Sequence, residues 1–231
     1  MKIEIYADGS DINEMISIHR HNKWVSGFTT NPTLMKKANV TNYKEFVKNV
    51  TDKIKDLPIS FEVFADEIDE MEKQAKLLSS YGSNIYVKIP VTNTKGQSTK
   101  YLIQKLLNAG TKINITAVFT KEQIDELLPY MLSDTNVILS IFAGRVADTG
   151  VDPKPIMQYA LDKVSKNVKV LWASPREVYN MYEADRLGCH IITVTSDILC
   201  KLKLENKNLS EYSLETVKMF YDDAKSSGYE L

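Results

Sequence analysis

Lys88 lies in the middle of an otherwise apolar segment, residues 85–92, whose β-branched side chains are typical of a buried strand. Side chains alternate along a strand, so Lys88 shares one face with Tyr86 and Pro90. The residues between them share the face that packs more easily against covering helices, and the Lys88 amine is therefore expected to point into an interior. Burial disfavours a charged amine, and a neutral lysine amine is a nucleophile. The structural alternative is a lysine that pairs with a buried carboxylate or reaches solvent at the strand end.

Other polar side chains follow the remaining expected strands, at strand ends or in the loops just after them. They are Asp8, Thr30, Asn31, Glu62, Asn114, Thr116, Ser140, Arg145, Ser174 and Arg176. Each has a structural explanation of its own, such as a helix cap, a turn before proline or a surface ion pair. An amine, two carboxylates and two carboxamides that converge in one interior carry a desolvation cost, however, and a functional site explains that cost best.

The chemistry of this set is coherent. A neutral Lys88 amine can condense with a ketone to a carbinolamine and then an iminium, which acts as an electron sink and permits cleavage of a neighbouring carbon–carbon bond. Asp8 can take the proton from the hydroxyl next to the breaking bond. Glu62 with Thr116 can hold a water molecule for proton transfer.

The remaining polar groups suit substrate binding. Side chains suited to hold substrate hydroxyls are Thr30, Asn31, Asn114 and Ser140. Arg145 and Arg176, with Ser174, supply charged and hydroxyl donors that suit a phosphate group at the far end of a substrate.

Strand patterns and helix patterns alternate along the whole chain. The expected strands cover residues 3–8, 24–31, 59–64, 85–92, 112–119, 136–144, 168–174 and 191–195. The expected helices are one capped by Asp11 and those over residues 43–55, 66–81, 98–109, 121–132, 155–165, 176–187, 197–203 and 213–225. About eight strand–helix units in a chain near the typical ~250 residues favour an α/β fold, the closed (β/α)₈ TIM barrel with an extra C-terminal helix, over an open sheet. The chemistry of such barrels lies at the carboxyl ends of the strands, where the polar set falls.

The chain is expected to be one domain, because no linker or composition break divides its 231 residues. Residues 1–231 form the barrel domain in this prediction, with about 205–231 as a C-terminal helical extension. That extension carries much apolar surface, so we expect it to pack across a subunit boundary in a homo-oligomer. The alternative is that it folds back on its own barrel. Its apolar residues are Leu214, Val217, Met219, Phe220 and Tyr221.

Composition excludes several classes of partner. The net charge is -1 and the isoelectric point is about 6.3, so no basic field is available to recruit nucleic acid or an anionic membrane. No run approaches the roughly 18 apolar residues of a membrane span, and the N-terminus lacks the apolar core of a secretion signal. We therefore expect a cytoplasmic protein. Cys189 and Cys200 make no metal-ligand pattern with the three histidines, so we expect no structural metal.

With these residues in view, the chain resembles the transaldolase family, which includes the related small fructose-6-phosphate aldolases. The resemblance covers nearly the whole chain. It rests on these segments, in this order: Ala7-Asp8, Thr29-Thr30-Asn31-Pro32-Thr33-Leu34, Phe61-Glu62-Val63, Val87-Lys88-Ile89-Pro90-Val91-Thr92, Asn114-Ile115-Thr116-Ala117-Val118-Phe119, Ser140-Ile141-Phe142-Ala143-Gly144-Arg145 and Ala173-Ser174-Pro175-Arg176.

The resemblance implies a specific reaction. A dihydroxyacetone unit passes from a ketose phosphate, such as fructose 6-phosphate or sedoheptulose 7-phosphate, to an aldose phosphate, as in the pentose phosphate pathway, with no metal or organic cofactor. Lys88 matches the Schiff-base residue, Asp8 the acid/base, and Glu62 with Thr116 the pair that positions water. Groups matching those that hold dihydroxyacetone are Asn31, Asn114 and Ser140, and groups matching the phosphate site are Arg145, Ser174 and Arg176. Compact members of the family form large rings, so a decamer is one expected assembly.

Glu62 favours a transaldolase, because the family's transaldolases have glutamate there while the fructose-6-phosphate aldolases have glutamine. Two features depart from the commoner transaldolase pattern: the chain is short, and Pro175 stands where an aromatic residue often separates Ser174 from Arg176. Two alternatives therefore stay open. One is an aldolase that reversibly cleaves fructose 6-phosphate to free dihydroxyacetone, and the other is a barrel that binds sugar phosphates without catalysis.

Overall fold

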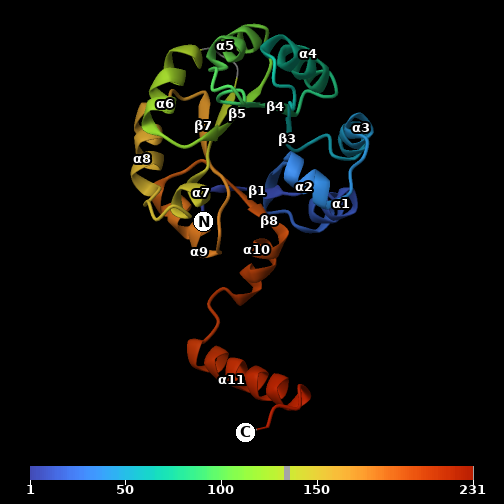
Figure 1. Cartoon of the computed structure of the whole chain (residues 1–231), viewed down its shortest axis with the longest axis vertical. Helices are drawn as coiled ribbons and strands as arrows, with labels where there is room; N and C mark the ends of the chain where they lie inside the picture. Colours follow the sequence, from blue (N-terminus) through green and yellow to red (C-terminus); the bar gives the residue numbers. More distant parts are fainter. Residues whose placement is uncertain (133–135, 231) are drawn as a thin grey trace.

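The computed structural model describes residues 1–132 and 136–230, and in that part of the chain eight parallel strands close into a barrel in sequence order (Figure 1). The ring is closed by β1 against β8, in a register that runs from Glu4 opposite Ile191 to Asp8 opposite Thr195. The strands are β1 (Glu4–Asp8), β2 (Val25–Thr29), β3 (Ile59–Glu62), β4 (Ile85–Pro90), β5 (Ile113–Val118), β6 (Val137–Ile141), β7 (Val168–Trp172) and β8 (Ile191–Thr195). The predicted TIM barrel is confirmed.

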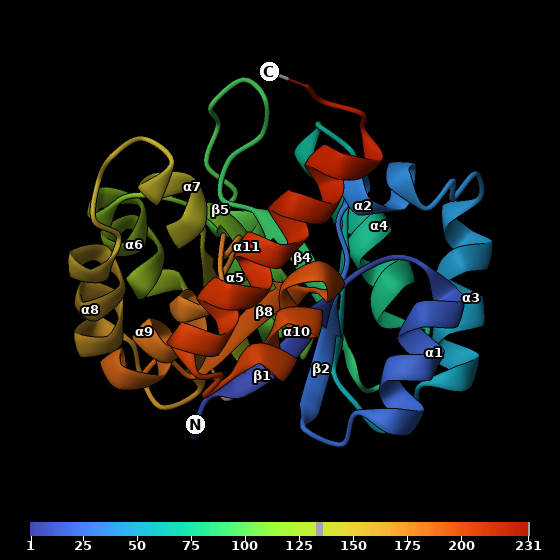
Figure 2. The same cartoon turned by 90° about the horizontal axis from the view of Figure 1, so that it is seen from below.

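Helices surround the strands in both views of the molecule (Figures 1 and 2). They are α1 (Ile12–His21), α2 (Pro32–Lys37), α3 (Tyr43–Lys53), α4 (Ile68–Ser79), α5 (Lys100–Asn108), α6 (Lys121–Leu127), α7 (Ala143–Ala147), α8 (Lys154–Lys163), α9 (Tyr179–Leu187), α10 (Ser196–Lys201) and α11 (Leu209–Ser226). Two 3₁₀ turns, η1 (Leu128–Tyr130) and η2 (Leu202–Leu204), extend α6 and α10. The predicted helix start at Asp11 is confirmed, because its side chain accepts the Glu14 N–H at 2.9 Å.

Two short helices were not predicted, and both lie at the end of the barrel opposite the chain's amino terminus (Figure 2). Helix α2 begins at Pro32, which the sequence pattern treats only as the end of a strand; proline also suits the first position of a helix, and Asn31 caps it. Helix α7 corrects the predicted strand 136–144, because β6 ends at Ile141. The predicted helix 121–132 is also too long, since Pro129 has no N–H for the regular helical bond and the chain tightens into η1.

The strands separate two apolar regions, as the alternation around Lys88 predicts. Val87 and Ile89 belong to the large core between strands and helices. The interior of the barrel holds a smaller cluster that includes Tyr6, with Tyr86 packed against it. Gly27 makes room for this cluster, because a Cβ at that position would stand 2.7 Å from the Tyr6 ring. The rest of the barrel interior is polar, and it is there that the candidate site lies.

Helix α11 stands apart from the barrel (Figure 1). None of its residues is buried, and Leu209, Val217 and Phe220 are 80%, 59% and 63% exposed. The predicted extension, about 205–231, begins just after η2 and contains α11, with Leu231 outside the described residues. Among the described residues, no helix is both long and apolar enough to cross a membrane.

Candidate active site

Lys88 is 6% exposed and lies on the inner face of β4. Its Nζ is 3.0 Å from Glu62 Oε2 and donates to the carbonyl oxygen of Thr30 at 2.8 Å. The parallel register of β3 and β4 places Glu62 beside Lys88. The ammonium is thus paired, as the structural alternative requires, but the same carboxylate is close enough to accept a proton and leave a neutral amine. The geometry fits a nucleophile that Glu62 can deprotonate.

Asp8 lies at the carboxyl end of β1, between Thr29 of β2 and Thr195 of β8 in the sheet register. The Thr29 hydroxyl donates to Asp8 Oδ1 at 2.7 Å and is itself in contact with the Thr193 hydroxyl. Burial raises the pKa of the Asp8 carboxyl, while the Lys88 charge and hydrogen bonds from Thr29 and Asn31 oppose that rise. A carboxyl group with a raised pKa suits proton exchange with a substrate hydroxyl.

Asn31 has a double role at the start of α2. Its Oδ1 accepts the Leu34 N–H at 3.0 Å, which is the helix cap. The acceptor is therefore occupied, and the side-chain N–H groups remain to face Asp8 and the cavity. Asn31 can donate to a substrate oxygen without giving up its structural role.

A buried row of hydrogen bonds crosses β3, β5 and β6. The Asn114 side-chain amide donates to Ser60 Oγ at 3.0 Å, and Ser140 Oγ donates to Asn114 Oδ1 at 2.7 Å. Two residues further along β5, Thr116 Oγ1 is buried and has no hydrogen-bond partner among the described residues. An unpaired buried hydroxyl calls for water or a ligand, which fits the predicted role of Thr116 in holding a water.

The basic end of the site is built on α7 and on the loop after β7. Arg145 projects from α7, and its guanidinium lies 5.7 Å from the centre of the Phe142 ring. Arg176 pairs with Asp148, with its Nε 3.0 Å from Asp148 Oδ1. Ser174, which also lines the cavity, has a φ of +61° that a serine rarely adopts. Such backbone conformations cluster at binding sites, where the surrounding structure enforces them.

One cavity of about 560 Å³ at the carboxyl ends of the strands joins these groups. Of the predicted site residues, those that line it are Asp8, Asn31, Glu62, Lys88, Asn114, Thr116, Ser140, Arg145, Ser174 and Arg176. Thr30 does not line it: its hydroxyl is buried and donates to the Ser60 carbonyl at 2.9 Å, and only its own carbonyl reaches Lys88. Its contribution is to hold the amine.

Several lining residues were missed by sequence reasoning: Thr29, Phe119, Phe142, Thr193, Thr195 and Asp197. Thr29 directly precedes the predicted Thr30, and strand alternation indicates that the two face opposite sides without showing which one faces the cavity. Thr193 lies opposite Tyr6 in the register of β8 against β1, so its inward direction follows from the alternation of β8.

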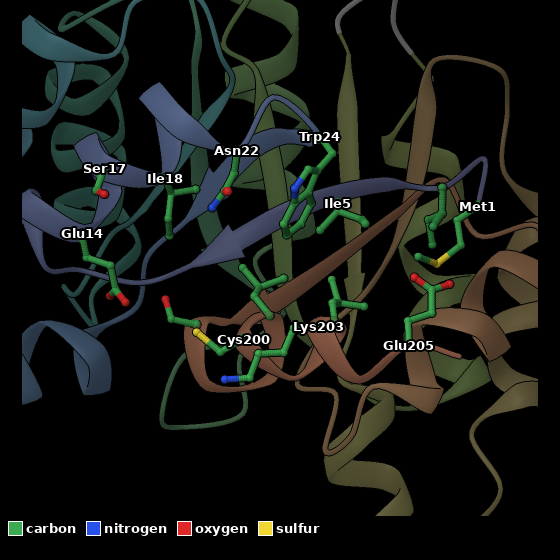
Figure 3. Close-up of a pocket in the computed structure, with 14 residues that line it drawn as sticks. Met1, Ile5, Glu14, Ser17, Ile18, Asn22, Trp24, Cys200, Lys203 and Glu205 are labelled. Carbon is green, nitrogen blue, oxygen red and sulfur yellow. The ribbon is translucent and has the colours of Figure 1, made fainter. Parts of the chain in front are cut away.

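A larger hollow, of about 910 Å³, lies outside the barrel between β1, α1 and α10 (Figure 3). Apolar side chains such as Ile5, Ile18 and Trp24 make much of its wall, and none of the predicted site residues lines it. In the described residues, no group of three or more His, Cys, Asp or Glu side chains is placed to hold a metal ion. The lysine–carboxylate cavity is therefore the candidate active site.

The fold and this cavity define a (β/α)₈-barrel enzyme with polar groups gathered around a buried lysine. The family model described as Transaldolase/Fructose-6-phosphate aldolase matches residues 5–231. The chain belongs to that family and is an enzyme of the aldolase and transaldolase type.

Curated relatives agree with this assignment. The chain is 31% identical over 210 residues to "Probable transaldolase" of a Thermoanaerobacter species, which covers 90% of each chain. It is 33% identical over 205 residues to "Probable transaldolase" of Clostridium kluyveri, covering 87% of this chain and 89% of that one. It is 32% identical to "Probable transaldolase 2" of Listeria monocytogenes over 181 residues, 77% of this chain and 78% of that one.

Among solved structures, 3-hexulose-6-phosphate synthase from Salmonella typhimurium aligns with a TM-score of 0.61. The alignment covers 85% of this chain and 89% of that one, at 14% sequence identity. This likeness shows the barrel fold alone.

Proposed function

We propose that this protein is a transaldolase, which transfers a dihydroxyacetone unit from a ketose phosphate to an aldose phosphate through a Schiff base on Lys88. The observation that carries the proposal is the buried Lys88 amine, 3.0 Å from the Glu62 carboxylate in a cavity that also holds Asp8. A cavity that only binds sugar phosphates needs neither the amine nor the two acids. The family membership and the names of the relatives point to the same chemistry.

The first half of the reaction forms the covalent intermediate. Glu62 accepts a proton from Lys88, and the neutral amine adds to the ketose carbonyl to form a carbinolamine. Loss of the carbinolamine oxygen as water, with protons returned by the two acids, gives the iminium. A water held between Glu62 and the unpaired Thr116 hydroxyl is suited to carry these protons.

The second half breaks and remakes a carbon–carbon bond. Asp8 takes the proton from the hydroxyl next to the bond, the electron pair of the breaking bond moves into the iminium, and an aldose phosphate leaves. The remaining three-carbon unit is an enamine on Lys88. An acceptor aldehyde adds to the enamine carbon and takes back the proton from Asp8, and hydrolysis of the new iminium releases the product ketose.

The other polar side chains of the cavity orient the substrate. Asn31, whose oxygen caps α2 and whose side-chain amide is left to donate, and the Asn114–Ser140 pair hold the hydroxyls of the dihydroxyacetone unit. Arg145, Ser174 and Arg176 bind the phosphate at the other end, where Arg side chains give directional, charge-assisted bonds. The substrate therefore spans the cavity from the amine to the arginines.

The experiment that tests the proposal measures both fates of the enamine in parallel. Wild-type enzyme is given fructose 6-phosphate and erythrose 4-phosphate, and sedoheptulose 7-phosphate and free dihydroxyacetone are quantified over time. The proposal predicts that transfer is much faster than release. If release of dihydroxyacetone dominates, the enzyme is a fructose-6-phosphate aldolase and not a transaldolase. If neither product forms, the barrel binds sugar phosphates without catalysis.

We also propose a homo-oligomer in which α11 packs against a second copy. The exposed apolar side chains of α11 and the distance of the helix from its own barrel support this assembly (Figure 1). Light scattering on the full chain and on a chain ending near Lys207 tests it. A full-length monomer at micromolar concentration would contradict it. The oligomer number and the cytoplasmic location stay predictions.

A further inference from the structure

Helix α7 lies directly on the loop that carries Ser174. The Gly144 N–H donates to the Ala173 carbonyl at 3.2 Å, and a Cβ on Gly144 would overlap the Ser174 carbonyl oxygen. Only glycine permits this approach. Because Arg145 follows Gly144 in the same helical turn, this contact fixes the origin of the Arg145 side chain relative to Ser174.

Asp148 ends the same helix and holds the second arginine. Its N–H donates to the Gly144 carbonyl at 3.0 Å, so its backbone belongs to the α7 turn. Its carboxylate accepts from Arg176 Nε at 3.0 Å and from Arg176 Nη2. This side-on pair leaves the N–H groups of Nη1 unused by Asp148. The Arg176 backbone is held as well, since its N–H donates to Asn180 Oδ1 at 2.8 Å.

The positive charges of the two arginines are balanced to different degrees. Arg176 is paired with Asp148, whereas Arg145 forms no ion pair within the described residues and instead lies over the Phe142 ring. Arg145 therefore brings to the cavity wall a positive charge that no ion pair within the described residues offsets. Both members of the pair are about half exposed, 49% for Arg176 and 51% for Asp148, so the pair contributes little to folding stability.

We propose that Asp148 is a positioning residue that holds the Arg176 guanidinium side-on, with Nη1 directed at a substrate phosphate that Arg145 and Ser174 also bind. The inference rests on the proposed function, which places the phosphate at this end of the cavity. A pre-oriented guanidinium loses less conformational freedom when it binds a phosphate, and small losses of alignment are costly. Helix α7 thus positions both arginines: Gly144 fixes where the Arg145 side chain begins, and Asp148 orients the Arg176 guanidinium.

The sign of one substitution tests this inference, because charge and position predict opposite results. Asp148→Ala removes a negative charge near a phosphate, so a purely electrostatic role predicts tighter binding. Positioning predicts weaker binding, by about tenfold for one misdirected charge-assisted donor. Asp162→Ala is the matched control, since it removes an exposed acidic side chain whose contact is with Gln158 on α8. Asp148→Glu is expected to restore part of the loss.

Inorganic phosphate is the probe, measured by calorimetric titration and by competitive inhibition of each variant. For Asp148→Ala we expect about tenfold weaker phosphate binding and a matching rise in KM for phosphorylated substrates. The kcat, and the KM for free dihydroxyacetone as donor, are expected to stay at wild-type values. Circular dichroism and the thermal midpoint establish folding, and Asp148→Asn, which keeps one oxygen acceptor, provides a milder variant.

Phosphate binding that is unchanged or tighter in both Asp148→Ala and Asp148→Asn would overturn the inference, as would an equal loss in Asp162→Ala. A wild type that binds no phosphate would overturn it too. If the wild type binds phosphate, and the loss of Asp148 weakens that binding, the Asp148 inference is supported. If the same wild type transfers no three-carbon unit, the transaldolase proposal alone is refuted. The two failures are therefore distinguishable.

Discussion

The two ends of the cavity are built in different ways. The amine end comes from strands: Lys88 and Glu62 are neighbours in the sheet register, and the amine is held by a strand-end carbonyl at 6% exposure. The proposed phosphate end comes from a five-residue helix and a loop, with Arg176 half exposed and Ser174 at a positive φ. In the proposed mechanism, bonds form where the side chains are buried, and the phosphate is bound where the side chains are half exposed. Substitutions at the first end should therefore change kcat, and those at the second should change KM.

The largest effect is expected for Lys88→Arg. Arginine keeps the positive charge beside Glu62 but cannot act as the nucleophile, so turnover is expected to fall by about 10⁴-fold or more. Folding should survive, because the ion pair is retained. Product formation and the thermal midpoint are the measurements, and near-normal turnover would remove the covalent mechanism.

Asp8→Asn should come next, with a loss of about 10² to 10⁴-fold in kcat. Asp8 must be ionised to act as the base, and burial raises its pKa above the usual range. The rate of the wild type should therefore fall as the pH drops through that raised pKa, and this acidic limb should vanish in Asp8→Asn. An acidic limb that persists unchanged in the variant would assign the titration to another group.

Glu62→Gln should lower the rate by about 10²-fold and also shift the ratio of transfer to release toward free dihydroxyacetone. A carboxylate can accept and return protons beside the iminium, and a carboxamide cannot. The fate of the enamine is therefore expected to depend on whether residue 62 is glutamate or glutamine. Parallel assays of sedoheptulose 7-phosphate and dihydroxyacetone give the ratio. If both reactions fall together, Glu62 serves only to pair with Lys88.

Arg176→Ala is expected to have the smallest effect on kcat of the four, because it belongs to the proposed phosphate end and changes KM. We expect KM for phosphorylated substrates to rise by about tenfold to over a hundredfold, since a charge-assisted contact contributes roughly 1.5 to 3 kcal/mol. The KM for unphosphorylated sugars should hardly change. Steady-state kinetics with phosphorylated and unphosphorylated substrates test this prediction. An equal rise in KM for both classes would contradict a phosphate site at this end of the cavity.

The sequence was sufficient to predict the barrel and the amine end because both depend on alternation. The inward direction of Lys88 and the order of the strands follow from patterns over several residues. The phosphate end was predicted as a set of residue types but not as an arrangement. Helix α7 is too short for a helical period to be recognised, and it exists because Gly144 can approach Ser174, a contact between distant parts of the chain.

Two further details required the structure. Thr30 and Thr29 are adjacent hydroxyls in one motif, and only the strand's direction shows that Thr29 faces Asp8 while Thr30 faces away toward Ser60. The pairing of Asp148 with Arg176 joins residues separated by 28 positions, and acidic residues are common enough that no pattern selects this one.

The most direct test of the account is borohydride reduction of the enzyme in the presence of fructose 6-phosphate, followed by peptide mass mapping. Reduction converts a Schiff base into a stable secondary amine, so the modified lysine can be identified. A Schiff base on Lys88 predicts a three-carbon or sugar adduct on the peptide that contains Lys88, and none in Lys88→Arg. An adduct confined to exposed lysines, or an active enzyme that forms no adduct at all, would contradict the central claim that Lys88 is the nucleophile.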